Sequence, residues 1–156
     1  MNEIEIFFSA IQNNNIENLK AQIKRNPELV NTQDARGFTP LIFASYFDKE
    51  AIVKLLIEHN AQIDNRDSTG NTALIGVSFK GNEPLADYLI KQGANINAKN
   101  STGATPLIFA SMYNKPNIVK LLLNNNADKT VIDNEGKTAL DYAKTKGFEE
   151  VLKILE

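Results

Sequence analysis

Chemistry that depends on cysteine, or on more than one histidine, has no residues to carry it in this sequence. The 156 residues contain no Cys and a single His, His59. Thiolate catalysis, Cys-ligated zinc and iron–sulfur clusters need Cys, and two-histidine metal motifs need a second His. A Ser–His–Asp triad would have to use His59, for which the sequence nominates no nucleophile and no orienting acid. We therefore expect an exposed residue at a helix end, and no catalytic residue.

A series of carboxylate and amide side chains is the next candidate for chemistry, since such oxygens bind cations. Its members lie 33 residues apart, each three residues before a glycine: Asp34, Asp67, Asn100 and Asp133. Units one step apart would pack at about 10 Å, too far for two members to share one ion. An Asx residue followed by Gly is typical of a tight turn. No GxxxxGK[ST] or GxGxxG phosphate loop occurs, so we expect no metal site and no cofactor.

Composition narrows the class of protein further. Hydrophobic residues make up 42% and charged residues 23%, with a net charge of −2 and a pI near 5.5. These values are ordinary for a folded soluble chain and argue against a dedicated nucleic-acid or membrane binder. The stretch Met1–Phe8 is acidic where a signal peptide is basic, which favours a cytoplasmic location while leaving a removed leader open. The abundance of Asn, Ile and Lys hints at an AT-rich, bacterial genome.

An internal repeat predicts the helices and turns that would position any functional site. The stretch 37–45, GFTPLIFAS, recurs at 103–111 as GATPLIFAS, with weaker copies at 70–74 and 136–140. The Thr of each copy is a helix N-cap candidate, and Pro40 and Pro106 suit the first helical position. A short helix should then end at residues that tolerate a left-handed backbone, namely Asp48, Gly81, Asn114 and Gly147. A second helix with apolar residues at helical spacing follows in each copy.

Period and motifs together resemble the ankyrin repeat over essentially the whole chain. Thr39-Pro40-Leu41 and Thr105-Pro106-Leu107 match the start of the family's TPLH box, and 52–56 and 118–122 match its second-helix core. The resemblance implies an all-α solenoid of about five helix-turn-helix units joined by β-turn loops. These form a single domain with units at about 1–33, 34–66, 67–99, 100–132 and 133–156, the outer two acting as caps. The box His is replaced by Ile42, Ile75, Ile108 and Asp141, so we expect apolar packing in its place.

The resemblance also implies that a partner binds the concave side, formed by the turn tips and the exposed face of the first helices. In the central units this register gives a row of aromatic and apolar side chains accompanied by basic ones. The residues expected to contact a partner are Arg36, Phe38, Tyr46, Phe47, Arg66, Phe79, Lys80, Lys99, Met112, Tyr113 and Lys146. Two alternatives stay open. The aromatic side chains could fold back over neighbouring helices, and the excess of basic residues on this face could reflect only that acidic residues lie mainly on the other face. Phe43, Phe109 and Tyr142, inside the box, are expected in the core.

The sequence thus predicts a non-enzymatic, monomeric protein–protein interaction module of the adaptor or inhibitor type. Its partner would be an acidic protein segment with one or more apolar anchors. A small-ligand binder or enzyme using the groove is one alternative, disfavoured by the missing Cys, the single His and the lack of phosphate loops. A nucleic-acid contact through the basic face is the other, disfavoured by the mild acidity of the chain. We expect no nucleic-acid partner and no membrane partner.

Overall fold

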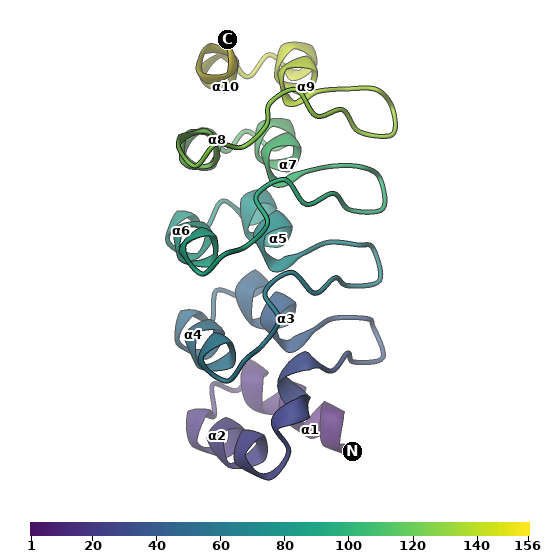
Figure 1. Ribbon diagram of the computed structural model, residues 1–156, viewed down its shortest axis with the longest axis vertical. Coiled ribbons are helices and arrows are strands. Elements are labelled where there is room, and N and C mark those ends of the chain that lie inside the picture. The colour runs from purple at the N-terminus through teal and green to yellow at the C-terminus, as the bar shows by residue number, and fades with distance from the viewer.

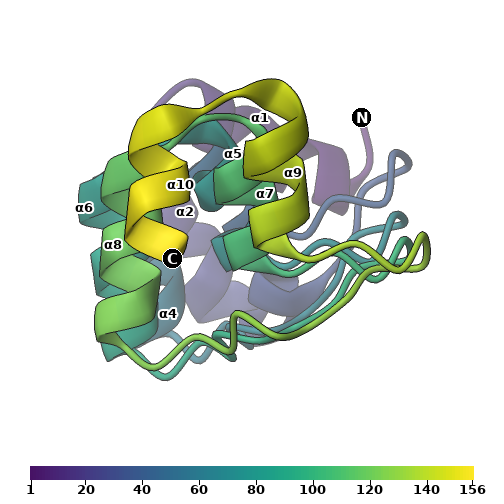
Figure 2. The ribbon, with the colours of Figure 1, turned by 90° about the horizontal axis from the view of Figure 1, so that it is seen from above.

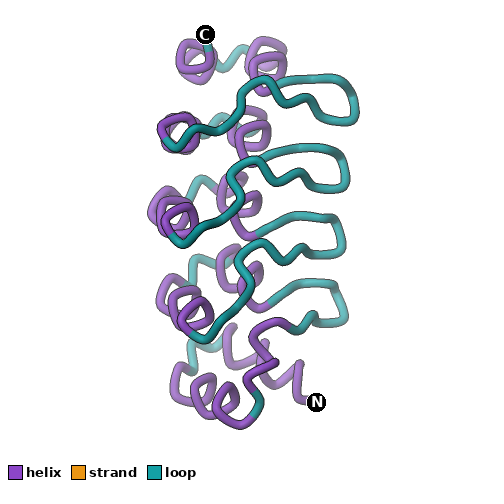
Figure 3. The backbone as a smooth tube through the Cα atoms, viewed as in Figure 1, coloured by secondary structure: helices purple, strands orange, loops and turns teal.

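Two columns of helices and a row of long loops make up the molecule. The computed structural model describes all 156 residues, with ten α-helices, one 3₁₀ helix and no strand. The odd-numbered helices form one column and the even-numbered helices the other, and the loops project beyond the odd-numbered column (Figures 1 and 3). The predicted all-α solenoid is confirmed. The helices are α1 (Glu3–Gln12), α2 (Ile16–Arg25), η1 (Pro27–Asn31), α3 (Pro40–Tyr46), α4 (Glu50–Glu58), α5 (Ala73–Lys80), α6 (Glu83–Lys91), α7 (Pro106–Met112), α8 (Pro116–Asn124), α9 (Ala139–Lys146) and α10 (Glu149–Leu155).

Each of the four later odd-numbered helices starts at the predicted threonine. The Oγ1 atoms of Thr39, Thr72, Thr105 and Thr138 accept the N–H three residues on, at 3.1 to 3.3 Å. The residue at that third position differs between units. It is a buried isoleucine in three units, as expected from apolar packing. In the last unit it is Asp141, whose exposed carboxylate accepts the backbone N–H of Thr138 at 2.9 Å and completes a capping box.

The loops owe their shape to the Asx series. In the third unit the Oδ1 atom of Asp67 accepts the N–H groups of Thr69 and Asn71 at 2.9 and 3.0 Å, and the other three members make the same pair of bonds. Gly70 follows with φ +78°, a backbone conformation open mainly to glycine. The short helices also end at the predicted left-handed residues, with φ between 57° and 83°. The series is therefore a set of turn formers.

Neighbouring turns stack closely. A Cβ atom on Gly103 would lie 2.6 Å from Oδ1 and 2.9 Å from the backbone N of Asn134 in the next turn. A second link between units repeats every 33 residues, because Gln33 donates to the carbonyl of Arg66, Arg66 to that of Lys99, and Lys99 to that of Ile132. Each side chain thus reaches the equivalent backbone position one unit on. We call these three bonds the inter-unit ladder.

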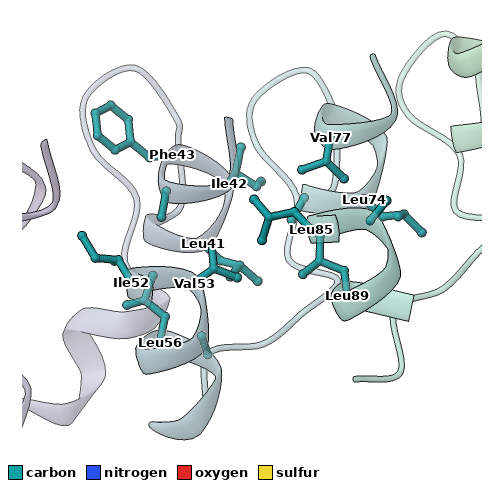
Figure 4. Close-up of a cluster of buried hydrophobic side chains, with 14 of the residues drawn as sticks. Leu41, Ile42, Phe43, Ile52, Val53, Leu56, Leu74, Val77, Leu85 and Leu89 are labelled. Carbon is teal, nitrogen blue, oxygen red and sulfur yellow. The ribbon is translucent and has the colours of Figure 1, made fainter. Parts of the chain in front are cut away.

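The core fills the space between the two columns as one continuous cluster. In Figure 4 the side chains of Leu41 and Val53, from α3 and α4, lie on the side of their unit that faces Leu85 and Leu89 of α6. Full burial of such a side chain contributes about 1.5–3 kcal/mol. The first unit departs from the pattern, because η1 replaces the extended link and buries Leu29 and Val30. This 3₁₀ helix was not predicted.

Candidate functional site

A hollow of about 270 Å³ lies over the middle of the odd-numbered column. It is lined by α3, α5 and α7 and by the loops that precede α3 and α5. Figure 2 shows these loops projecting away from the odd-numbered helices. We call this hollow the central hollow. Its aromatic lining is Phe38, Tyr46, Phe79, Phe109 and Tyr113, its other lining on the helices is Ile42, Ile75 and Gly76, and its polar edge is Asp67, Asn71 and Thr72.

The hollow exists because one of four equivalent helix positions has no side chain. Counting in steps of 33 residues, the position after the box isoleucine holds Phe43, Gly76, Phe109 and then Tyr142. Three units therefore carry an aromatic ring where α5 carries a glycine. A Cβ atom added to Gly76 would meet nothing within 4 Å. Space that a ring occupies in the other units is open in the third.

The rings around this space hold one another in fixed arrangements. Tyr113 meets Phe79 edge to face, with centroids 4.6 Å apart and planes at 87°, and stacks on Phe109 at 5.9 Å. Both spacings are within the range that aromatic pairs prefer. Tyr46 and Tyr113 keep 40% and 41% of their surface exposed. The aromatics therefore partly fold over neighbouring helices and still present surface to solvent.

Two lysines lie against the exposed tyrosines. Nζ of Lys80 lies 4.7 Å from the ring centre of Tyr46, and Nζ of Lys146 lies 5.8 Å from that of Tyr113. Neither ammonium group forms an ion pair. Asp67 is the single carboxylate in the lining, and its Oδ1 atom is already used by the turn. The central hollow thus has two lysines without ion pairs beside its tyrosines and one carboxylate, that of Asp67, on its polar edge.

Five of the residues predicted to contact a partner lie away from the central hollow. Arg36 pairs with Asp34 at 2.6 Å, and its guanidinium lies 5.0 Å from the ring of Phe38. Arg66 and Lys99 donate to backbone carbonyls in the inter-unit ladder. Phe47 is 51% exposed but packs on Phe43 at 4.9 Å, beside a separate depression, and Met112 packs against the core. The hollow gathers Phe38, Tyr46, Phe79 and Tyr113, with Lys80 and Lys146 beside its tyrosines.

Of the three box aromatics expected in the core, one is buried, and the other two pack against the core while remaining partly exposed. Phe43 is buried, because Phe8 of α1 meets it edge to face at 5.5 Å. Phe109 is only half-buried, because the neighbouring unit offers Gly76 instead of a ring, so it lines the hollow. Tyr142 is also half-buried and donates its hydroxyl proton to Oδ2 of Asp133. The sequence does contain a signal for the hollow that the sequence analysis missed. When the four boxes are aligned, Gly76 stands at the position where the other three have an aromatic residue.

Two groups with shifted pKa values, Tyr142 and Asp133, belong to the last unit and are hydrogen-bonded to each other. The hydrogen bond to Asp133 raises the pKa of Tyr142. Burial alone would raise the pKa of Asp133, but the hydrogen bonds from Tyr142 and from the N–H groups of Lys137 and Glu135 outweigh it and lower that pKa.

His59 is exposed at the end of α4, with Nδ1 2.8 Å from the carbonyl oxygen of Leu55, which confirms its helix-end position. No three His, Asp or Glu side chains group closely enough to hold a metal ion. No helix combines the length and apolar character needed to cross a bilayer.

Comparison with known proteins finds a matching family model and a relative that is similar over a short segment. A family model described as ankyrin repeats in three copies matches residues 7–100 and 76–156. The human DNA-binding protein RFXANK is 44% identical to the chain over 46 residues. That match covers 30% of the chain and 18% of RFXANK, so less than a fifth of the relative's length is represented.

Proposed function

Because the chain belongs to the ankyrin repeat family, a non-enzymatic fold that generally serves protein–protein interaction, we propose that it binds an acidic protein segment along its concave face. The central hollow is the main contact in this proposal. An adaptor and an inhibitor would use the site in the same way, because both need only hold a segment of another protein. In this proposal the chain acts as a monomer in the cytoplasm.

The observation that carries the proposal is the pair of exposed tyrosines, each accompanied by a lysine without an ion-pair partner. Tyr46 and Tyr113 both line the hollow, one from α3 and the other directly after α7. Aromatic side chains beside a preformed pocket are the residues that most often dominate interface energies. The charges of Lys80 and Lys146 are available to carboxylates of a partner, which favours an acidic segment.

The opposite face offers much less to such a partner. Three lysines on the middle even-numbered helices are already matched with acids: Lys54 with Glu50 at 3.3 Å, Lys91 with Asp87 at 2.7 Å, and Lys120 with Glu150 at 3.7 Å. Lys24 of α2 and Lys153 of α10, at the two ends of the column, form no ion pair. Charge that is matched within the chain attracts little from outside. A nucleic-acid contact finds little support on the concave side, because Arg36, Arg66 and Lys99 are engaged with groups of the chain itself.

The test is a comparison of two sets of variants in binding to the partner recovered from the native lysate. We expect Tyr46→Ala and Tyr113→Ala each to weaken binding about tenfold or more, or about 1.4 kcal/mol, with little change in melting temperature. Lys80→Glu should mainly slow association, and the loss should shrink at high salt.

The matched controls lie on the even-numbered helices. Lys54→Ala and Lys120→Ala remove lysines whose side chains are 46% and 53% exposed, and they should leave affinity unchanged. Normal binding by both tyrosine variants, together with loss of binding by the lysine controls, would show that the partner uses the other face.

A further inference from the structure

Building on the proposed function, we propose that the open space above Gly76 is a subsite for one aromatic side chain of the partner segment, with acidic residues on either side of that side chain. The partner's ring would occupy the position that Phe43, Phe109 and Tyr142 fill in the other units. With the partner bound, all four equivalent positions would hold an aromatic ring.

No structural requirement of the chain accounts for a glycine at this position. Seven of the eight glycines have positive φ, which explains their presence through backbone geometry. Gly76 is the remaining one, lies inside α5, and has an open Cβ position. Glycine is unfavourable inside a helix relative to alanine. A residue that weakens its helix without a backbone or packing reason points to a need for the space itself.

The hollow has the dimensions and lining that a ring requires. Its volume is about 270 Å³, whereas an apolar cavity of about 150 Å³ is enough to hold benzene. Phe79, Phe109 and Tyr113 already form edge-to-face and stacked pairs at 4.6 and 5.9 Å. An incoming ring would add further edge-to-face or stacked contacts to this group of rings.

Charge decides what flanks the ring in the partner. Lys80, at the end of α5, lies against Tyr46, and Lys146, at the end of α9, lies against Tyr113. An extended segment whose aromatic residue enters the hollow can therefore place one carboxylate toward each ammonium group. Tyr46 and Tyr113 lie two units apart, or about 20 Å at about 10 Å per unit. The expected pattern is therefore an aromatic residue with an acidic residue on each side, spread over about six residues at about 3.3 Å each.

The probes are N-acetyl-phenylalanine, which joins one ring to one carboxylate, and the peptide Asp-Glu-Phe-Glu-Asp, each with an alanine analogue as control. In amide NMR titrations of the whole chain we expect shifts at Gly76, Phe79 and Tyr113 with both phenylalanine probes. The alanine analogues should cause no shifts there. No shift at these residues at millimolar probe, or equal shifts with the alanine analogues, would overturn the subsite.

The matched variants are Gly76→Phe and Gly76→Ala. Gly76→Phe fills the hollow from within and should weaken peptide binding at least tenfold without lowering the melting temperature, whereas Gly76→Ala should keep at least a third of the affinity. Unchanged binding by Gly76→Phe would overturn the subsite. If Tyr113→Ala still weakened partner binding in that case, the proposed concave-face function would stand alone. Should Gly76→Phe fail to fold, the probe titrations on the unaltered chain decide by themselves.

Discussion

The fourth and fifth units carry equivalent residues 33 positions apart, yet only the fourth has a neighbour on both sides. Gly103 faces Asn134 of the next turn, whereas a Cβ atom on Gly136 would meet nothing within 4 Å. Ile108 is buried, and its counterpart Asp141 is an exposed cap. The two units have the same turns and helix caps, but only the fourth is covered by a following unit.

The difference separates the repeat motif into two sets of residues. The threonine cap, the Asx turn and the left-handed helix end are present in both units, so they serve the unit in which they lie. The buried isoleucine of the box is needed only where another unit follows. The same holds for the absence of a Cβ atom at the turn glycine, which lets the next turn pack closely. Stability in such a stack is a sum of unit terms and neighbour terms, and the paired positions allow each to be measured.

The largest expected effect comes from the box leucines. Leu107 is 1% exposed between its neighbours, while Leu140 of the last unit is only half-buried. Leu107→Ala should cost about 2–5 kcal/mol of unfolding free energy through the cavity it leaves, and Leu140→Ala clearly less. Urea unfolding of both variants measures this, and equal costs would refute the dependence on neighbours.

The turn glycines separate backbone cost from neighbour cost. Gly103 and Gly136 have φ of +79° and +75°, so alanine at either position should cost about 1–2 kcal/mol for the left-handed backbone. Gly103→Ala should cost about 1–3 kcal/mol more, because its Cβ atom would overlap the next turn. Thermal melts of the pair give the difference directly, and a difference near zero would mean that the turns are not in close contact.

The Asx position distinguishes the two units by its response to acid. Asn100 forms the same turn bonds as Asp133, but of the two only Asp133 accepts a hydrogen bond from the hydroxyl of Tyr142. We expect Asp133→Asn to lower the unfolding free energy by about 1 kcal/mol at pH 7 by weakening a charge-assisted hydrogen bond.

The direction of this pH dependence follows from the lowered pKa of Asp133. In the unfolded chain the carboxyl has a pKa of about 3.9, so its stabilising effect is complete above that value. The effect is lost as the pH falls through the lower pKa of the folded state. Urea unfolding at pH 7 and near pH 3 should therefore show the gap between the wild-type chain and Asp133→Asn closing in acid. In a Tyr142→Phe background that gap should already be small at pH 7.

The smallest expected effect extends the comparison to the third unit. Gly76 occupies the position of Phe109 and Tyr142, inside a helix and with an open Cβ position. Gly76→Ala should stabilise the chain by about 0.5–1 kcal/mol through backbone entropy and helix propensity. A loss of stability in chemical unfolding would indicate a packing role for Gly76 that its surroundings do not show.

Sequence patterns sufficed for most of the fold and for part of the site. The period, the threonine caps, the left-handed ends and the Asx turns are local features, so they could be read residue by residue. Arg66 and Lys99 were assigned to partner contact because their positions face the turns, but their donors reach carbonyls one unit away. The helix η1 was missed since its stability depends on burying Leu29 and Val30 against other elements. The central hollow depends on an absent side chain, which a search for chemically active residues passes over.

The position of the central hollow also decides how it behaves when the ends of the stack open. Terminal units of a solenoid fray first, since they lose contacts with one neighbour only, and hydrogen exchange of their amides reports this local opening. The lining comes from α3, α5 and α7 and the loops before α3 and α5, and each of those helices has another odd-numbered helix packed on both sides. Amides of α9 and α10 should therefore exchange early, while those of α5 exchange only when the whole stack opens. The hollow thus lies in the slowest-exchanging segment, and transient melting of α10 would leave its walls in place.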